Sequence, residues 1–366
     1  MHPLLPIYAL TSLIALVGVN MRDKSERTTV WFAGWASMLV ILFGIAFRSI
    51  QGDTWRYAQT YIRLSNLGLA EALAQADGNW LFVILNWALG QISPNPVFLN
   101  VFVAFSCLYI LNSSLKKLFS PTQTAICILL YSAFPFWVFY VSSGMKQALA
   151  MGLLMQSYIA FYHQKRSAWL WLGAAPLVHS GALLVYPFVI THLLTWRPSF
   201  GYRRAIVFSL LLLSASIFLS MAGLTKTFMQ PLQAAVPLSD NYEIYFQDAS
   251  SFNYRAGFRW DFTIFSILPL MVAFWLRRRG NRLSLMVSGW WLNLYILLIT
   301  IYQLFSFAPF ADRFAGFGWN LVPLILMVMV TDIQRPLALK RVILLYSVAN
   351  LLILQFYTGN GLAVAF

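Results

Sequence analysis

Long uninterrupted apolar runs constrain this chain more than any other feature of its sequence. Of its 366 residues, 60% are hydrophobic and 10% are charged, whereas soluble domains are about half apolar and about a quarter charged. A helix needs about 20 apolar residues to cross a bilayer. The sequence therefore predicts an all-α polytopic fold with a single integral membrane domain over residues 1–366. Crossings are predicted at residues 3–20, 30–48, 96–114, 121–140, 144–162, 204–223, 261–276, 283–305, 314–331 and 341–358.

Two further apolar stretches do not fit one crossing each. Residues 79–92 are too short, and residues 167–196 are too long for one span and too short for two. If every basic loop is cytoplasmic, the first becomes a re-entrant or interfacial helix on the outer side. The second becomes two short helices that meet at "AAPLVHSG", where Pro176 and Gly181 permit a break. His179 then lies deep in the membrane.

The same scheme assigns the longer polar segments to one side. It places the loops 49–78 and 224–260 outside, together with both chain termini. One crossing more or fewer near residues 79–92 would invert the N-terminal end. The first apolar stretch has no basic flank and no small-residue cleavage site, so it is interpreted as a retained span.

The charge of the chain is strongly positive, at +14. Nucleic acid is a poor explanation, because the basic residues are spread over short loops between apolar runs. One interpretation is topological, since Lys and Arg hold loops in the cytoplasm. The other is an anionic lipid or phosphate substrate. The only cysteines, Cys107 and Cys127, both lie inside apolar runs, which argues against a disulfide scaffold or a zinc site.

The stretch "FRSIQGDTWRYAQTY" gathers polar groups at the end of an apolar run. Asp53, Tyr57 and Tyr61 are spaced to share one face of a short helix. An interfacial amphipathic helix explains the aromatic residues. It does not explain Asp53, because a carboxylate gains nothing at an anionic surface. Asp53 beside Arg48 is therefore predicted to form half of a polar site.

Three polar residues fall inside later apolar runs. Lys146 and Gln147 open the span "GMKQALAMGLL". Lys146 alone fits a lysine that reaches back to the surface, but the amide of Gln147 needs a partner within the membrane. His179 is either a hydrogen-bonded core histidine or a proton-transfer group, because imidazole titrates near neutral pH.

The loop 224–260 and a later stretch supply more outer cations. Aromatic residues such as Tyr254 alternate with polar groups and precede Arg255 and Arg259, as expected for sugar and phosphate contacts. A lid loop with interfacial anchors is the alternative. "FAPFADRFAGF" places Asp312 and Arg313 at the outer end of a span, where a local ion pair is the simpler interpretation. All these cations, with Arg48 and Lys146, nonetheless face one compartment.

Four motifs in this order resemble the EpsG family, which belongs with the Wzy-type polymerases of bacterial surface polysaccharides. They are Arg48 with "GDTWRYAQTY", "GMKQALAMGLL", "LVHSGALLVYPF" and "DRFAGF". Lys146 stands where the family usually has arginine, and Gly181 replaces a more typical residue. The resemblance covers most of the chain.

The resemblance implies a glycosyltransferase of the GT-C kind, with roughly 11–14 transmembrane helices and a cavity on the outer face. Its substrates would be oligosaccharides linked to undecaprenyl pyrophosphate, joined on the periplasmic face of the inner membrane into O-antigen, capsule or exopolysaccharide. No cofactor, metal or nucleic acid is implied. Partners would be membrane lipid and a chain-length regulator or flippase of the same pathway.

The residues suit this role in a specific way. The outer cations would hold the pyrophosphate and stabilise its charge as it leaves. Asp53 or His179 would take the proton from the acceptor hydroxyl. Substrate contacts are expected from Arg48, Tyr57, Lys146, Gln147, Tyr254, Arg255, Arg259, Asp312 and Arg313. A non-enzymatic transporter of lipid-linked saccharide is the rival interpretation. A membrane acyltransferase that uses His179 is a third.

Overall fold

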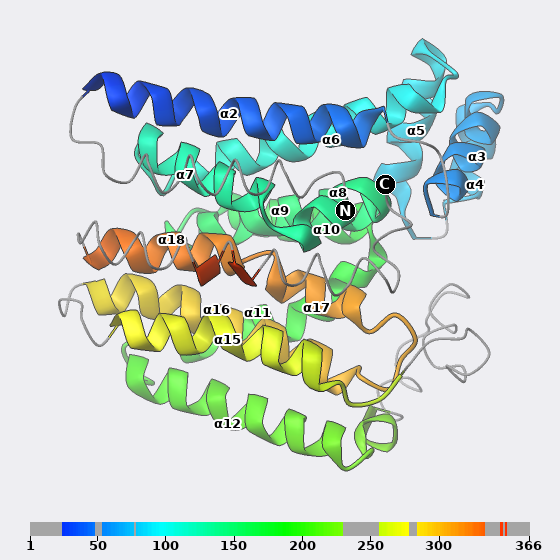
Figure 1. Cartoon of the computed structure of the whole chain (residues 1–366). Coiled ribbons are helices and arrows are strands. Elements are labelled where there is room, and N and C mark those ends of the chain that lie inside the picture. The colour runs from blue at the N-terminus through cyan, green and yellow to red at the C-terminus, as the bar shows by residue number, and fades with distance from the viewer. Residues whose placement is uncertain are drawn as a thin grey trace. The chain divides into compact units, whose positions relative to one another are not determined.

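The computed structural model describes residues 24–47, 53–76, 78–229, 256–277, 284–333, 345–346 and 348–349. All regular structure in these residues is helical (Figure 1). Several of the helices are long and apolar, so the predicted all-α polytopic membrane fold is confirmed. The helices divide into two compact units. Unit 1 is Met1–Ala182 with Arg335–Phe366, and unit 2 is Leu183–Gln334.

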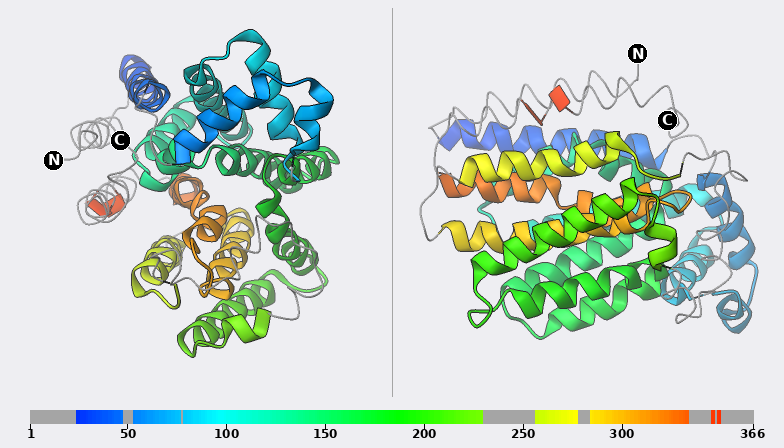
Figure 2. Two further views of the ribbon diagram at one scale, coloured as in Figure 1. Left: turned by 90° about the vertical axis from the view of Figure 1, so that its right-hand side faces the viewer. Right: turned by 90° about the horizontal axis from the view of Figure 1, so that it is seen from below.

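Unit 1 combines long helices with three short ones that follow the first polar segment. α2 and α6 lie side by side in Figures 1 and 2, and α9 packs against both α6 and α10. The short helices α3, α4 and α5 gather at one end of the unit (Figure 1). The bounds are α2 Lys24–Ala46, α3 Asp53–Ser65, α4 Leu69–Ala74, α5 Trp80–Ile92, α6 Pro96–Leu115, α7 Pro121–Ser132, α8 Pro135–Ser143, α9 Met145–Tyr162 and α10 Ser167–Val178.

Unit 2 is arranged around α16. This helix packs against α11, α12, α15, α17 and α18, and 89% of its apolar window is buried, against 33% for α12. α16 is therefore an interior helix, whereas α12 presents most of its surface outward. The bounds are η1 Ser180–Val185, which begins in unit 1, then α11 Tyr186–Thr195, α12 Tyr202–Met221, α15 Trp260–Arg277, α16 Ser284–Leu304, α17 Asp312–Trp319 and α18 Val322–Ile333.

The described helices include four that are long and apolar enough to cross a membrane, or five if one bent pair counts as a span. These are α6, α12, Val287–Leu304 within α16, and Asp312–Thr331 through α17 and α18. α5 is shorter, at 13 residues, as expected for a helix that does not cross. The predicted total of roughly 11–14 membrane helices stays a prediction, because residues 1–23 and 350–366 lie outside the described part.

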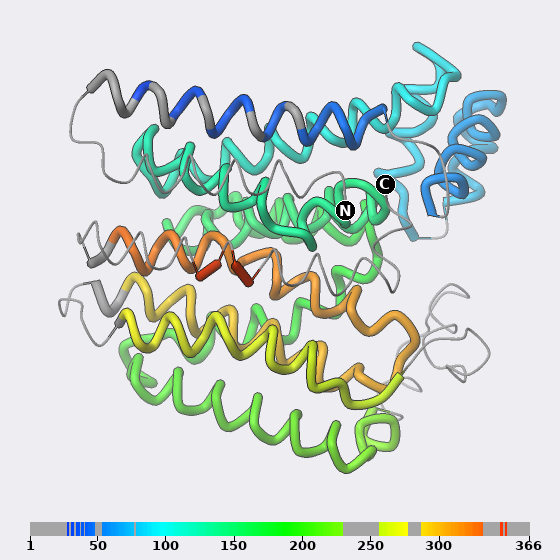
Figure 3. The backbone as a smooth tube through the Cα atoms, viewed as in Figure 1, coloured from blue at the N-terminus to red at the C-terminus, as the bar shows by residue number. Residues whose placement is uncertain are grey.

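The predicted crossing at residues 121–140 is not one continuous helix. α7 and α8 are bent by 72° relative to each other (Figure 3). Phe134 is extended, with φ −92° and ψ 107°, and Pro135 opens α8. Proline has no N–H for the helix ladder, and it also disfavours the helical conformation of the residue before it. An apolar run that is continuous in sequence is therefore broken in its backbone.

The predicted break inside residues 167–196 is confirmed. α10 ends at Val178, and His179 is extended, with φ −148° and ψ 106°. A 3-10 helix then leads into α11. The break comes three residues after Pro176, which itself lies within α10, and it leaves His179 between two helical segments.

The short helices of unit 1 are fixed to one another by hydrogen bonds as well as by apolar contacts. The Trp87 indole N–H donates to the carbonyl of Leu67 at 3.0 Å, and the Gln91 amide donates to the carbonyl of Ser65 at 3.1 Å. At Gly90 a Cβ would lie 2.6 Å from the Cβ of Ser65, so α3 and α5 touch through backbone. This packing gives α3, which carries Asp53 and Tyr57, a rigid support.

Candidate functional site

Contacts from α3, α9 and the break after α10 converge on the start of α5. We define the unit 1 cluster as Asp53, Tyr57, Asn79, Phe82, Lys146 and His179. The Lys146 ammonium lies 5.9 Å from the ring centre of Tyr57 on α3 and 5.8 Å from that of Phe82 on α5. Tyr57 and Phe82 pack edge to face at 5.9 Å. Lys146 is therefore turned towards two aromatic rings, a geometry in which a cation is attracted to the π-face.

Asp53 occupies the start of α3 in this cluster. It is one helical turn from Tyr57, so both lie on the same face. Its carboxylate accepts a hydrogen bond from the guanidinium of Arg56. The Asp53 side chain is 25% exposed, whereas that of Arg56 is 73% exposed. Asp53 is thus sheltered but reachable, and its carboxylate sits at the positive end of the helix dipole.

His179 joins the cluster through its neighbour Ser180. The Asn79 side-chain oxygen accepts hydrogen bonds from the Ser180 backbone N–H at 3.1 Å and from the Ser180 hydroxyl at 3.3 Å. Asn79 is one turn before Phe82 on α5. The helix break at His179 is therefore tied to the same turn that carries an aromatic partner of Lys146.

Two more predicted or neighbouring residues of unit 1 are buried. Gln147 follows Lys146 on α9 and is 4% exposed. On α3, the Tyr61 hydroxyl donates to the carbonyl of Ser93 at 2.6 Å, and burial raises the pKa of this phenol. Tyr61 therefore has a structural task, whereas Tyr57 on the same face contacts Lys146 and Phe82.

A second group of charges lies at one end of unit 2, where α16 ends and α15 and α17 begin (Figure 1). We define the unit 2 cluster as Arg259, Asp261, Phe262, Tyr302, Asp312 and Arg313. The Arg259 guanidinium carbon lies 3.6 Å from the centre of the Phe262 ring. Its Nε donates to Asp261 at 3.1 Å, and its Nη2 donates to the second carboxylate oxygen. Arg259 is thus held both by stacking on Phe262 and by a bidentate ion pair with Asp261.

Arg313 is held by a different device. Its guanidinium carbon lies 4.9 Å from the centre of the Phe310 ring. Phe310 has φ +58°, a left-handed conformation that is an outlier for a bulky residue. Strain of this kind persists only where the surroundings impose it, and it is common at functional sites. It places an aromatic face under Arg313 just before α17.

The interior wall of the unit 2 cluster is formed by Tyr302. Its ring packs against Phe262 at 5.7 Å and against Trp319 at 6.3 Å. Tyr302 is 1% exposed, and its hydroxyl has no hydrogen-bond partner among the described residues. It lies within electrostatic range of Arg259, Asp261 and Asp312. Tyr302 and Asp261 are not evident as site residues from the sequence, because both stand inside predicted apolar spans.

A model of the EpsG family matches residues 32–362, which is nearly the whole chain. The chain belongs to the EpsG family. The family is associated with Wzy-type polymerases, which suggests a role like that of a polysaccharide polymerase. Comparison with curated proteins and with solved structures found no match.

The EpsG match contains all four motifs of the sequence analysis, and the structure can be compared with each. The motifs that carry Asp53, Lys146 and His179 meet in the unit 1 cluster. The motif with Asp312 and Arg313 belongs to the unit 2 cluster, together with Arg259. Asp53 pairs with Arg56 in the structure, and its predicted pairing with Arg48 stays a prediction. Arg48, Tyr254 and Arg255 lie outside the described residues, so their roles stay predictions.

The most buried histidine in the described part of this EpsG member is His192, in the last turn of α11. It is 1% exposed. Its Nδ1 lies 2.9 Å from the Asn293 amide, whose oxygen accepts from the Ser209 hydroxyl at 2.7 Å. The ring is buried because α11 packs on α16. His192 is therefore a hydrogen-bonded core histidine. His179, in contrast, lies at the helix break and is half-buried.

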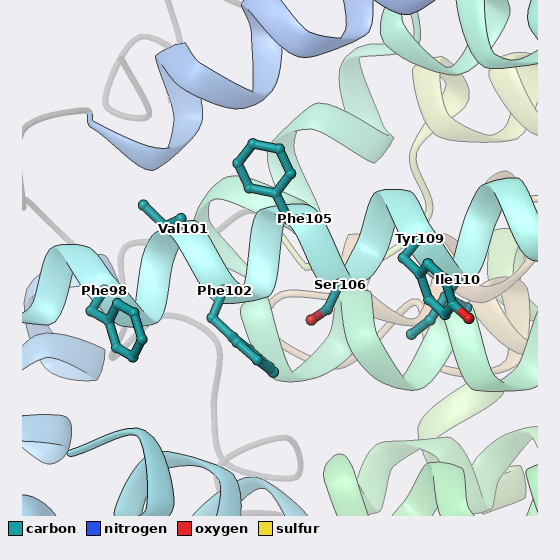
Figure 4. Close-up of a pocket in the computed structure, with 7 residues that line it drawn as sticks. All are labelled: Phe98, Val101, Phe102, Phe105, Ser106, Tyr109 and Ile110. Atoms are coloured by element: carbon teal, nitrogen blue, oxygen red, sulfur yellow. The ribbon is translucent and has the colours of Figure 1, made fainter. Parts of the chain in front are cut away.

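A groove on α6 is a third candidate binding surface, in addition to the two clusters. Its volume is 510 Å³ (Figure 4). Its lining comes from α6 alone and contains no carboxylate, histidine or cation, which makes it unsuited to acid–base chemistry and suited to a hydrocarbon chain. The residues are Phe98, Val101, Phe102, Phe105, Ser106, Tyr109 and Ile110.

Proposed function

We propose that the chain is a glycosyltransferase of the GT-C kind that polymerises polysaccharide repeat units at the periplasmic face of the bacterial inner membrane. Both substrates are oligosaccharides carried on undecaprenyl diphosphate, and the product is O-antigen, capsule or exopolysaccharide. EpsG family membership supports the polymerase role. The observation that supports a diphosphate donor is Arg259, whose guanidinium is stacked on Phe262 and presents its donors to a carboxylate.

That arrangement suits an anionic leaving group. An arginine fork matches two oxygens of a phosphate as it matches those of a carboxylate. Stacking fixes the plane of the guanidinium before substrate arrives, so little reorganisation is needed as charge develops. Arg313 over Phe310 offers a second fixed cation. Arg255 and Tyr254 are assigned to the same diphosphate site from the sequence alone.

The reaction joins two chains by one substitution. The acceptor hydroxyl attacks the anomeric carbon of the donor sugar, and a new glycosidic C–O bond forms. The bond from that carbon to the diphosphate oxygen breaks, and its electron pair leaves with the diphosphate. The proton of the hydroxyl passes to a base, for which Asp53 and His179 are the candidates. Lys146, Gln147 and Tyr57 bind the acceptor, and the α6 groove holds a polyprenyl tail.

The residues of the unit 1 cluster support this division of labour. Asp53 is partly sheltered and lies at a helix start, and His179 stands in an extended conformation at the break after α10. The partly exposed ring of Tyr57 beside Lys146 offers a flat apolar surface for the C–H face of a sugar. A chain-length regulator or flippase of the same pathway is the expected partner of such an enzyme.

One assay tests the proposal. Purified protein in nanodiscs is incubated with lipid-linked repeat units, and the products are separated by size. A ladder of glycans is expected from the wild-type chain, and loss of the ladder is expected from Asp53→Asn or His179→Ala. A transporter would move the same lipid-linked saccharide across a vesicle membrane without lengthening it. Translocation in vesicles with no ladder would therefore contradict the polymerase assignment.

A further inference from the structure

The guanidinium of Arg259 already has a bound carboxylate, although the proposed function requires this guanidinium to bind the diphosphate of the substrate. Asp261 binds the guanidinium through both carboxylate oxygens, one of them at 3.1 Å from Nε. A carboxylate and a phosphate present the same pair of acceptor oxygens to a guanidinium. Asp261 is only two residues from Arg259, so this occupant is supplied locally by the start of α15.

The two partners of this ion pair are anchored very differently. The Arg259 side chain is 19% exposed, and that of Asp261 is 46% exposed. Arg259 is also fixed by Phe262, and its backbone carbonyl accepts from the Thr263 hydroxyl at 2.8 Å. Gln303 donates to that same hydroxyl at 3.0 Å, which connects Arg259 to α16. The cation is therefore held in place independently of Asp261, whereas the carboxylate can turn into solvent.

Buried polar groups behind the ion pair also indicate a ligand. The Tyr302 hydroxyl and the Gln303 side-chain oxygen are buried and lack hydrogen-bond partners among the described residues. A buried polar group without a partner costs free energy unless a ligand or water supplies one. Tyr302 lies within electrostatic range of Arg259 and Asp261. An anion with both acceptor and hydroxyl groups would satisfy these atoms.

From these observations we propose that Asp261 is an internal place-holder for the diphosphate. In the free protein its carboxylate occupies the Arg259 fork. When the lipid-linked saccharide binds, a diphosphate oxygen pair replaces it, and Asp261 turns outward. The Tyr302 hydroxyl donates to the same diphosphate once the ion pair has parted. A solvent-exposed ion pair contributes little stability, so little is lost when a diphosphate replaces Asp261.

The inference rests on the proposed function, and it predicts that removing an acid tightens binding. Asp261→Asn keeps the size of the side chain but gives up its charge. Its affinity for undecaprenyl diphosphate, in nanodiscs of zwitterionic lipid, should rise about 5-fold over wild type, because the ligand no longer competes with an ion pair. Tyr302→Phe should weaken the same affinity by about 10-fold, the effect of one hydrogen bond to a charged group.

Matched variants separate this mechanism from general effects. Glu71→Gln removes one negative charge at an exposed helix cap and should leave the affinity unchanged. Tyr295→Phe removes a hydroxyl from the same helix as Tyr302, but that hydroxyl donates to the carbonyl of Ser266 at 2.9 Å. It should lower the melting temperature and not the affinity. Tyr302→Phe should not lower the melting temperature, because its hydroxyl has no described partner to lose.

The outcomes distinguish this inference from the proposed function. If wild type does not bind undecaprenyl diphosphate, the diphosphate site of the proposed function and the inference both fall. If wild type binds and Asp261→Asn binds equally or more weakly, only the place-holder role falls, and Asp261 is a support for Arg259. In an Arg259→Ala background the gain from Asp261→Asn should largely disappear, and a full gain there would also overturn the exchange.

Discussion

The unit 1 and unit 2 clusters both place cations over aromatic rings, but they hold them with different precision. Lys146 lies almost 6 Å from two ring centres, whereas Arg259 lies 3.6 Å from one ring and is also bound by a carboxylate. An ammonium is a flexible point charge, and a guanidinium is a flat fork with fixed directions. The difference suits the roles proposed for the two clusters, an adaptable surface in unit 1 and a preset anion site in unit 2.

The acidic residues of the two clusters differ in the same sense. Asp53 has an exposed partner, Arg56, and stays partly sheltered itself. In unit 2 the relation is reversed, because Asp261 is the more exposed member and Arg259 the anchored one. A carboxylate that must accept a proton should be the fixed group. A cation that must accept an anion should likewise be the fixed group, so the two clusters suit opposite tasks.

The largest effect is expected from removing the proposed base in unit 1. Asp53→Asn keeps the shape of the side chain and one acceptor oxygen for Arg56, but it cannot take a proton. General-base catalysis contributes about 10²–10⁴-fold in rate. We therefore expect turnover to fall by about that factor while the fold and the affinity for lipid-linked saccharide persist. Single-turnover measurement of glycan extension, with binding measured separately, checks this.

The histidine variants decide between the two candidates. If Asp53→Asn turns over normally and His179→Ala does not, the base is His179 and Asp53 is structural. His163→Ala is the matched control, because the His163 ring lies in the turn after α9, with its Nε2 3.2 Å from the carbonyl oxygen of Lys117 and no part in the unit 1 cluster. Normal turnover in both variants would contradict proton transfer in unit 1, and Asp261 and Asp312 of unit 2 would be the next residues to test.

A smaller loss is expected from the anion site of unit 2. Arg259→Ala should weaken use of the lipid-linked donor by about 10- to 100-fold, since hydrogen bonds to charged groups contribute about 1.5–3 kcal/mol. Arg259→Lys should recover only part of this, because an ammonium lacks the planar fork. The Michaelis constant for donor, measured at saturating acceptor, checks the prediction.

Arg203 provides the control for that loss. It is exposed at the start of α12, so Arg203→Ala removes an equal charge from the same unit without touching the cluster. An equal loss in Arg203→Ala and Arg259→Ala would show that only the overall charge matters, and the contrast between the clusters would lose its basis in geometry.

Sequence patterns predicted the local parts of this comparison well. Lys146 and Gln147 do open a helix, Asp53 and Tyr57 do share a helix face, and His179 does stand at a break. The spacing of apolar and polar residues decides these features, and the spacing is local. The order of the motifs also predicted EpsG family membership, which the match over residues 32–362 confirms.

Contacts between distant segments were beyond such patterns. Asn79 and Ser180 are 101 positions apart, and their hydrogen bonds depend on packing that no local period encodes. α16 has no distinct polar face, so its sequence gives no sign that Tyr302 faces charged groups. The bend at Phe134 was missed for a related reason, because continuous apolar character on both sides of Pro135 concealed the break in the backbone.

A third prediction tests whether unit 1 needs a rigid support for its more adaptable cation. Gly90→Ala would place a Cβ 2.6 Å from the Cβ and 3.0 Å from the Cα of Ser65, which forces α3 and α5 apart. Overpacking of this kind costs about 1–3 kcal/mol. We expect a lower melting temperature and a weakened contact between Lys146 and Tyr57.

Gly173 is the matched control, because a Cβ there meets nothing within 4 Å. Gly173→Ala in α10 should raise stability slightly, by about 0.5–1 kcal/mol, since alanine loses less backbone entropy in a helix. An unchanged melting temperature in Gly90→Ala would mean that α3 moves freely on α5, and the support assigned to Asp53 would be absent.

The smallest effect is expected at Lys146, and it sharpens the contrast most. Cation–π contacts contribute about 0.5–2 kcal/mol, so Lys146→Met should reduce acceptor affinity by about 2- to 30-fold. Tyr57→Leu should give a similar loss, and the double variant should lose less than the two losses combined, because the residues interact directly. Lys165→Met, in the exposed turn after α9, should leave the affinity unchanged.

Lys146→Arg should retain function, since a guanidinium stacks on aromatic rings at least as well. The clusters then respond oppositely, because exchanging the cation type is tolerated in unit 1 and costly at Arg259. If Lys146→Arg is as damaging as Arg259→Lys, Lys146 contacts its ligand with a fixed geometry, and the adaptable surface assigned to unit 1 is wrong.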